Sequence, residues 1–193
     1  MLLELIRRVV WDGGPMNVPT VMLSVLSLGI MLERGWFWAR RMLSWDLELR
    51  RELRHVSLDD RRVLLSRDPV VSFLATRKQE KRFEVLRAAA EEEVATLHRG
   101  LGVMGFVTQV ATSLGLFGTV VGISMSFGSF VSGEASSVAQ GLAVALYTTV
   151  VGLAVFLYTF LGLAVLSWMA KFETRALEDA LGILEEHAKG GAP

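Results

Sequence analysis

The sequence predicts an all-α membrane protein with three transmembrane helices, the long ones extending into a helical cytoplasmic region. Two observations on charge and length carry this prediction. Residues 100–170 contain a single formal charge, Glu134, while nearly all other charge lies in 33–99 and in the last 23 residues. The apolar stretches on either side of Glu134 each exceed the ~20 residues that a membrane span requires. One carboxylate cannot keep such a stretch soluble, so this part of the chain must face lipid or protein.

The pattern divides the chain into seven consecutive segments. Between Leu2 and Trp11, apolar residues recur at helical spacing with polar residues between them. This pattern predicts an amphipathic helix before the turn at Gly13-Gly14-Pro15. The segments are an N-terminal amphipathic helix at 1–15, transmembrane helix 1 at 16–39, a cytoplasmic helical region at 40–99, transmembrane helix 2 at 100–131, an external loop at 132–137, transmembrane helix 3 at 138–170 and a cytoplasmic tail at 171–193.

The first span has a short apolar core, which Trp36 and Trp38 extend as expected interfacial anchors. We expect residues 40–55 to continue this helix. Further along the chain, Ser57 with Asp60 fits a capping box, and Asp68-Pro69 fits an N-cap followed by proline at the first helical position. From about Lys78 no residue breaks the helical pattern before Gly100, so we expect a helix that runs straight into the second span.

The distribution of basic residues predicts the orientation in the membrane. Residues 34–99 carry fifteen of the twenty Lys and Arg residues, whereas 129–137 carry none. Because cytoplasmic segments are enriched in Lys and Arg, the N-terminus and the 129–137 loop are expected outside and the C-terminus inside.

Small and hydroxyl-bearing residues form a stripe along the second span. They recur at spacings of 4, 3, 4, 3 and 4, which places them on one helical face: Thr108, Thr112, Gly115, Thr119, Gly122 and Ser126. Gly118 and Gly122 make a GxxxG pair, and the third span adds Thr148, Thr149 and Gly152. Such a stripe has two uses, since small residues permit close helix packing and hydroxyls can line a wet path for an ion. Both interpretations remain open on this pattern.

Several chemistries are excluded or made improbable by residue content. The chain has no cysteine, its three histidines are scattered and its net charge is zero, so we expect no metal, no cofactor and no nucleic-acid partner. No nucleophile–base pair or phosphate loop is evident, so an enzyme is not predicted. Neither the second nor the third span contains Asp, Glu, Lys, Arg or His. A proton pathway of the usual kind would therefore need an acid from a partner.

Four motifs resemble the ExbB and TolQ branch of the MotA/TolQ/ExbB proton-channel family. They read GGPMNVP, LSLGIMLERGWFWARR, ATSLGLFGTVVGISMSF and VAQGLAVALYTTVVGLAVF, and the most specific element is LGLFGTVVG. The resemblance implies a homopentamer around a pore, threaded by two copies of a single-span partner like ExbD or TolR whose membrane aspartate carries the proton. It also implies that Thr119 and Thr149 line the pore.

Two positions depart from the family pattern. Val144 stands where this branch commonly has a glutamate in the third span, and Thr112 stands where a proline often precedes the second-span motif. The resemblance predicts a pore-forming subunit of an inner-membrane motor, driven by ions and most simply by protons. Thr108, Thr112, Thr148 and Ser126 are further pore-lining candidates, and Gly115, Gly118, Gly122 and Gly152 are assigned to helix packing. The alternative is a non-conducting pentameric scaffold of a transport or motility complex.

Overall fold

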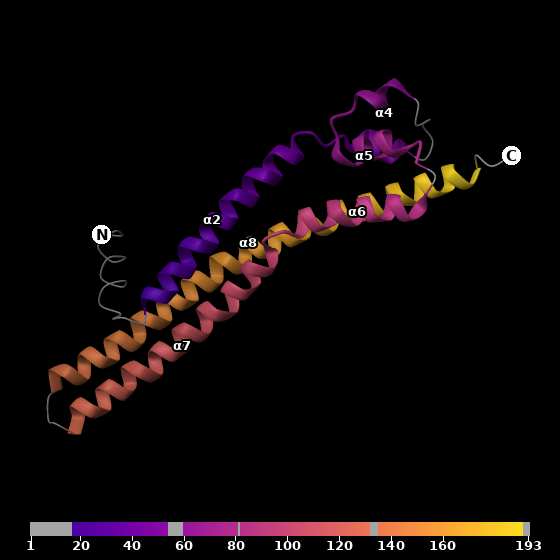
Figure 1. Ribbon diagram of the computed structural model, residues 1–193. Helices are drawn as coiled ribbons and strands as arrows, with labels where there is room; N and C mark the ends of the chain where they lie inside the picture. Colours follow the sequence, from indigo (N-terminus) through magenta and orange to yellow (C-terminus); the bar gives the residue numbers. More distant parts are fainter. Residues whose placement is uncertain (1–16, 54–59, 81, 132–134, 191–193) are drawn as a thin grey trace. The chain divides into compact units, whose positions relative to one another are not determined.

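The computed structural model describes residues 17–53, 60–80, 82–131 and 135–190 (Figure 1). Helices and short connections account for these residues, and no strand occurs among them. The helices are α2 (Asn17–Met42), α3 (Leu47–Glu52), α4 (Arg61–Leu65), α5 (Pro69–Arg77), α6 (Phe83–His98), α7 (Leu101–Val131) and α8 (Ala135–Gly190). The predicted N-terminal amphipathic helix and the first half of the predicted external loop, residues 132–134, lie outside the described residues.

Three of the helices are long and apolar enough to cross a membrane, which confirms the predicted fold class. They are α2, α7 together with the segment preceding it, and α8. Helix α8 contains 56 residues, nearly three times the ~20 that a span needs. The chain divides into two compact units. A first unit comprises residues 1–32 and 100–164, and a second comprises 33–99 and 165–193.

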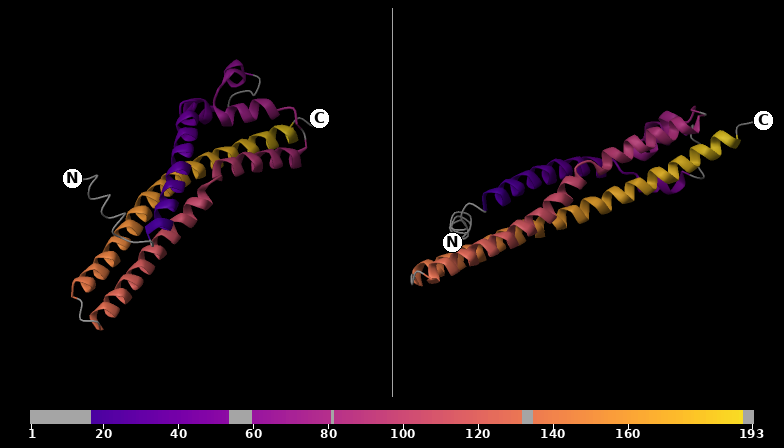
Figure 2. Two further views of the ribbon diagram at one scale, coloured as in Figure 1. Left: turned by 60° about the vertical axis from the view of Figure 1, so that its left-hand side comes forward. Right: turned by 60° about the horizontal axis from the view of Figure 1, so that its bottom comes forward.

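In the first unit, α7 and the first part of α8 lie side by side as an antiparallel pair (Figures 1 and 2). The core of the pair is apolar and contains Val107, Ala111 and Val155. Leu23 of α2 also packs against this core, as do Val151 and Tyr158 of α8. The N-terminal part of α2 is thereby held against the pair.

A cluster of hydroxyl groups joins α2 to α8 within the first unit. The Tyr158 hydroxyl donates to the Ser24 carbonyl oxygen at 2.8 Å and lies 2.6 Å from the Ser27 hydroxyl. The Thr159 hydroxyl donates to Ser27 Oγ at 3.4 Å. Since polar groups in an apolar environment need partners, each hydroxyl here satisfies another and fixes the position of α2 along α8.

Tyr158→Phe should therefore loosen α2 without creating a cavity. We expect a loss of about 0.5–1.5 kcal/mol in the free energy of unfolding, seen as a lower thermal midpoint in detergent. Tyr147→Phe is the matched control, because no hydrogen bond of the Tyr147 hydroxyl is present in the described structure. Equal midpoints for the two variants would contradict the assignment.

In the second unit, α2 ends at Met42 and does not continue to residue 55 as predicted. The chain turns through Leu43 and Ser44, and α3 begins at Leu47 with Asp46 as its N-cap. The Asp46 carboxylate accepts a hydrogen bond from the Leu49 backbone N–H at 3.0 Å, which satisfies a donor that the helix start leaves open. A good N-cap four residues after the end of α2 thus starts a separate helix.

Of the two helix starts predicted next, that of α5 is confirmed and the capping box before α4 is wrong. Asp68 caps α5 with Pro69 at the first position, as predicted, and its carboxylate accepts from the backbone N–H groups of Val70 and Val71. Asp60 is itself the N-cap of α4, with non-helical backbone angles, so it does not occupy the N3 position of a capping box. Ser57 lies outside the described residues.

The predicted uninterrupted helix from Lys78 into the second span is also wrong. Helix α6 begins at Phe83 and ends at His98. Arg99 has an extended ψ of 133°, and Gly100 has a φ of 82°, a left-handed conformation that glycine adopts without the cost of a Cβ. Glycine at this position therefore ends one helix and lets the next begin at Leu101.

Trp36 and Trp38 do not share the predicted role of interfacial anchors. Trp36 is 64% exposed, whereas Trp38 is 1% exposed and packs inside the second unit. Residues two apart on a helix point in nearly opposite directions, so only one ring of this pair can face outward.

A buried ionic network holds the second unit together. Glu173 of α8 is fully buried and binds Arg41 of α2 at 3.0 Å and Arg50 of α3 at 2.8 Å. Arg50 also binds Asp68, the buried N-cap of α5, at 2.8 Å. Burial by itself lowers the pKa of Arg50, but its hydrogen bonds to Glu173 and Asp68 outweigh burial and raise this pKa. Arg41 reaches α6 as well, through Glu93 at 2.8 Å.

Glu173→Gln should destabilise the second unit strongly, because it leaves Arg41 and Arg50 without their shared buried carboxylate. Breaking a buried pair from one side costs about 3–5 kcal/mol. Thermal unfolding of the purified protein in detergent measures the effect. Glu178→Gln, at an exposed position of the same helix, is the control and should unfold like the unaltered protein. Similar midpoints for both variants would show that the network contributes little.

Candidate functional site

The contact between α7 and α8 is built on glycines in the first unit. A Cβ added at Gly152 would lie 2.8 Å from the Ala111 carbonyl oxygen and 2.8 Å from the Gly115 Cα. A Cβ at Gly122 would lie 2.7 Å from both the Gly141 carbonyl oxygen and the Ala145 backbone nitrogen. Real Cβ atoms do not approach other atoms this closely, so the two backbones meet at distances that only glycine permits.

Gly118 leaves space for the side chain of Thr148. An added Cβ at Gly118 would overlap Thr148 Cβ and Oγ1, so the absence of a side chain there makes room for the threonine. Gly115, Gly118, Gly122 and Gly152 all lie in this contact, and all four are buried. The four glycines that the sequence assigned to packing therefore lie where α7 meets α8.

The hydroxyls of the predicted stripe occupy two different environments. Three are buried inside the helix pair, namely Thr108 at 6%, Thr148 at 2% and Ser126 at 9% exposed. Each donates to a carbonyl oxygen of its own helix, and Ser126 also donates to the Val138 carbonyl oxygen of α8 at 3.0 Å. These three hydroxyls are thus satisfied within the chain and lie away from its surface.

The other three hydroxyls lie at the margin of the contact. Thr112 is exposed, and Thr119 and Thr149 are half-buried. Thr149 Oγ1 donates to the Ala145 carbonyl oxygen at 3.1 Å and lies 3.4 Å from the Gly115 carbonyl oxygen across the contact. Thr112 and Thr119 donate to carbonyl oxygens of α7 itself. Each of these hydroxyls keeps lone pairs that a further donor can reach.

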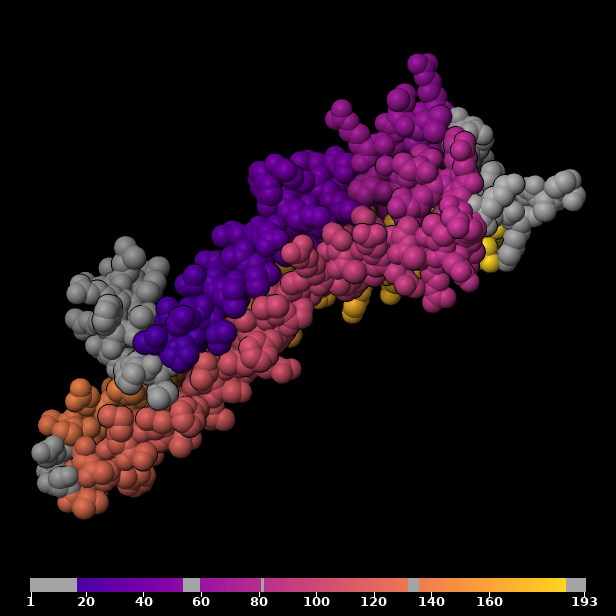
Figure 3. Space-filling view, in the orientation of Figure 1, coloured from indigo at the N-terminus to yellow at the C-terminus, as the bar shows by residue number. Residues whose placement is uncertain are grey.

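The outer faces of α7 and α8 are mostly apolar. The side of α7 turned to the viewer in Figure 3 is not covered by another described helix. The exposed large side chains include Leu116, Phe117, Val120, Phe127, Phe130, Leu142, Leu146, Leu153 and Leu157. An apolar surface of this extent needs lipid or other protein against it. The threonine hydroxyl oxygens at the edge of the α7–α8 contact are therefore polar groups within a mostly apolar surface.

No ionisable carboxylate or base lies in the described helices of the first unit. Residues 17–32, 101–131 and 135–164 contain no Asp, Glu, Lys, Arg or His. Val144, where the resemblance leads one to expect glutamate, is half-buried on α8. Among the described residues, no group of three or more His, Cys, Asp or Glu side chains is placed to bind a metal. The described helices of this unit can supply hydrogen-bonding walls to an ion, but not a group that changes charge.

Sequence reasoning missed the polar groups that join distant segments. The cluster of Ser24, Ser27 and Tyr158 was not singled out, although serines three apart in an apolar span place two hydroxyls on one face. Arg34, at the end of the apolar core, is 4% exposed and donates to the Thr96 carbonyl oxygen at 3.0 Å. Its burial signals that this part of α2 packs against protein.

A family model described as the MotA/TolQ/ExbB proton channel family matches residues 55–179. The chain belongs to this family. Among curated relatives, an ExbB-like biopolymer transport protein 1 of Synechocystis is 30% identical over 171 residues, covering 80% of this chain and 67% of the relative. An ExbB-like protein 3 of the same organism is 29% identical, covering 77% of this chain and 79% of the relative.

A shorter match is with an ExbB homologue of Methanothermobacter thermautotrophicus, which is 44% identical over 64 residues. It covers 33% of this chain and 23% of the relative. No solved structure matches significantly. Membership of the MotA/TolQ/ExbB family, with three apolar helices of spanning length, makes the chain a membrane protein of a channel family.

Gly152→Ala should force α7 and α8 apart, because its Cβ would meet backbone atoms that cannot move aside by rotation. Overpacking of this kind costs about 1–3 kcal/mol, which we expect as a lower thermal midpoint and a lower yield of folded protein in detergent. Gly102→Ala is the matched control, since nothing lies within 4 Å of the added Cβ. If Gly152→Ala were as stable as Gly102→Ala, the close contact would be wrong.

Proposed function

We propose that this chain is the pore-forming subunit of an ion-driven motor, most simply a proton-driven one, in the bacterial inner membrane. Five copies surround a lumen that holds two copies of a single-span partner similar to ExbD or TolR. The N-terminus lies outside and the C-terminus lies in the cytoplasm. Ion passage turns the ring relative to its partner and so performs mechanical work.

The observation that carries this proposal is the pairing of accessible hydroxyls with the lack of any ionisable group. Thr112, Thr119 and Thr149 present oxygen atoms at the edge of the α7–α8 contact. The apolar helices around them contain no acid or base. A carboxylate entering this environment from a partner would need hydrogen bonds, because an unpaired charge in an apolar medium is costly. The hydroxyls are suited to that task.

The geometry permits the hydroxyls to serve both protonation states of such an acid. A threonine that donates to its own helix keeps its oxygen lone pairs free, so it can accept from a protonated carboxyl group. When the acid is ionised, rotation about χ1 or of the O–H bond lets the same hydroxyl donate to the carboxylate. The three buried hydroxyls at Thr108, Ser126 and Thr148 have no part in this proposal, since they lie inside the helix pair.

A non-conducting scaffold is the second candidate function. Val144 in place of a glutamate supports it, because a ring without ionisable groups in its walls can assemble other proteins without passing ions. Proton flux into liposomes that contain the ring with its partner separates the two functions. Flux above that of empty liposomes supports the motor, and its absence supports the scaffold.

Thr119→Val and Thr149→Val test the role of the hydroxyls, since valine keeps the shape of threonine and removes the oxygen. A hydrogen bond to a charged group contributes about 1.5–3 kcal/mol. One charge crossing 100 mV supplies only ~2.3 kcal/mol. We therefore expect each variant to assemble normally and to lose roughly tenfold or more of its proton flux in proteoliposomes.

Thr174→Val is the control for these two variants. Its hydroxyl makes the same kind of bond to its own helix, with the Ala170 carbonyl oxygen at 2.8 Å, but lies in the second unit. Flux should be unchanged. Unaltered flux in both Thr119→Val and Thr149→Val would mean that these residues serve packing alone.

The proposed orientation can be tested on a chain that naturally lacks cysteine. Val131→Cys places a thiol at the end of α7, where the native side chain is 89% exposed. Glu186→Cys places a thiol near the C-terminal end of α8. A membrane-impermeant maleimide added to intact cells should label the first variant and not the second. The reverse pattern would overturn the orientation.

A further inference from the structure

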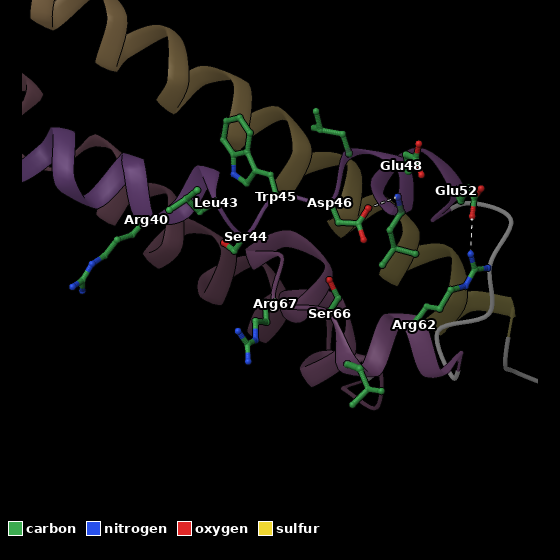
Figure 4. Close-up of a pocket in the computed structure, with 13 residues that line it drawn as sticks. Arg40, Leu43, Ser44, Trp45, Asp46, Glu48, Glu52, Arg62, Ser66 and Arg67 are labelled. Atoms are coloured by element: carbon green, nitrogen blue, oxygen red, sulfur yellow. Dashed lines mark hydrogen bonds and ion pairs between the residues drawn. The ribbon is translucent and has the colours of Figure 1, made fainter.

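An open pocket of about 1060 Å³ lies in the second unit, just past the end of α2 (Figure 4). It is formed by the last turn of α2, the turn that follows, α3, α4 and the residues after α4. Every one of these segments belongs to the same unit, so the pocket is complete within it. Its lining mixes arginines, serines, carboxylates and leucines.

Two arginines at the pocket have no carboxylate partner in the described structure. Arg40 and Arg67 lie toward one end of the pocket, while Glu48 and Glu52 lie toward the other (Figure 4). The third arginine, Arg62, is engaged by Glu52 at 3.4 Å. A pair of unpaired guanidinium groups at one end of a concave surface favours an anion with several oxygen atoms.

The guanidinium of Arg40 also locates the pocket relative to the membrane surface. It lies 4.8 Å from the centroid of the Trp36 ring, one turn earlier on α2, and that ring is 64% exposed. Exposed tryptophan at the end of an apolar helix prefers the headgroup level of a bilayer. The arginine stacked on it is therefore at a height where lipid phosphates are found.

The pocket has an exposed apolar rim. Leu43 is 89% exposed, Leu65 is 72% exposed and Leu47 is 47% exposed, and all three line it. Exposed leucines beside arginines fit a ligand that has both a charged head and an apolar tail.

We propose that this pocket binds an anionic phospholipid of the adjoining leaflet. The phosphate lies between Arg40 and Arg67, and the acyl chains cover Leu43, Leu47 and Leu65. The charges of the lining are unevenly placed, since Arg40 and Arg67 have no carboxylate partner at one end, whereas Asp46, Glu48 and Glu52 lie nearer the other (Figure 4). The two unpaired guanidinium groups at one end favour an anionic headgroup over a zwitterionic one. Free phosphate fits less well because it leaves the leucines uncovered. The inference does not depend on ion conduction.

Native mass spectrometry of the intact oligomer in detergent tests the proposal. The delipidated protein is titrated with phosphatidylglycerol, with phosphatidylcholine of the same acyl chains, and with inorganic phosphate. We expect phosphatidylglycerol to be retained at a concentration at least tenfold lower than phosphatidylcholine. The double variant Arg40→Gln with Arg67→Gln should abolish this difference, and Leu43→Ser with Leu65→Ser should weaken retention of both lipids.

Arg61→Gln is the matched control, because Arg61 is an exposed arginine of α4 that does not line the pocket. It should bind phosphatidylglycerol like the unaltered protein. Equal retention of the two lipids, or the same loss in Arg61→Gln as in the double variant, would overturn the proposal. So would displacement of phosphatidylglycerol by millimolar inorganic phosphate, which would assign the site to the free anion. Circular dichroism of each variant verifies that it is folded.

Discussion

The close backbone contact between α7 and α8 is the constraint on which the rest of the membrane unit depends. Two apolar helices gain little from hiding their side chains from lipid, so their association relies on packing at short distance. Gly152 against Gly115, and Gly122 against Gly141, bring the backbones together. Because that contact fixes the rotation of both helices, it also decides which hydroxyls are enclosed and which remain at the edge.

In the function proposed above, the two possible uses of the polar stripe, helix packing and ion solvation, belong to different residues. Thr108, Thr148 and Ser126 are inside the pair and bond to carbonyl oxygens, as packing residues do. Thr119 and Thr149 are at its margin, where a neighbouring helix can reach them. A single helical face can therefore serve packing along its centre and solvation along its edge. The lumen proposed here requires only the edge.

The sequence predicted the elements whose signal is local. The three spanning helices follow from the charge-free stretches, and the start of α5 follows from Asp68 and Pro69. The helix ends were harder, because the same composition allows α2 to continue past Met42. Only the capping of α3 by Asp46 and the left-handed conformation of Gly100 show where helices stop. The spacing of apolar residues along the sequence does not show where the backbone leaves the helical conformation.

The interactions that the sequence analysis missed most completely are ion pairs between residues distant in sequence. Glu173 meets Arg41 and Arg50 across more than 120 residues, and nothing in their local patterns distinguishes them from solvated charges. Trp38 likewise has the composition of an interfacial anchor but is enclosed by protein. For the candidate site, the sequence supplied a set of candidate residues, whereas the structure was needed to separate the buried candidates from the accessible ones.

The most direct test of the central claim is cross-linking between copies through the edge of the contact. Thr119→Cys in membranes, treated with a short thiol-to-thiol linker, should form a ladder that ends at five subunits on denaturing gels. Val120→Cys, at a neighbouring position that is 60% exposed on an apolar face, should form few cross-links because its thiol faces lipid or the flank of the ring. A ladder from Val120→Cys and none from Thr119→Cys would contradict a shared lumen lined by this threonine.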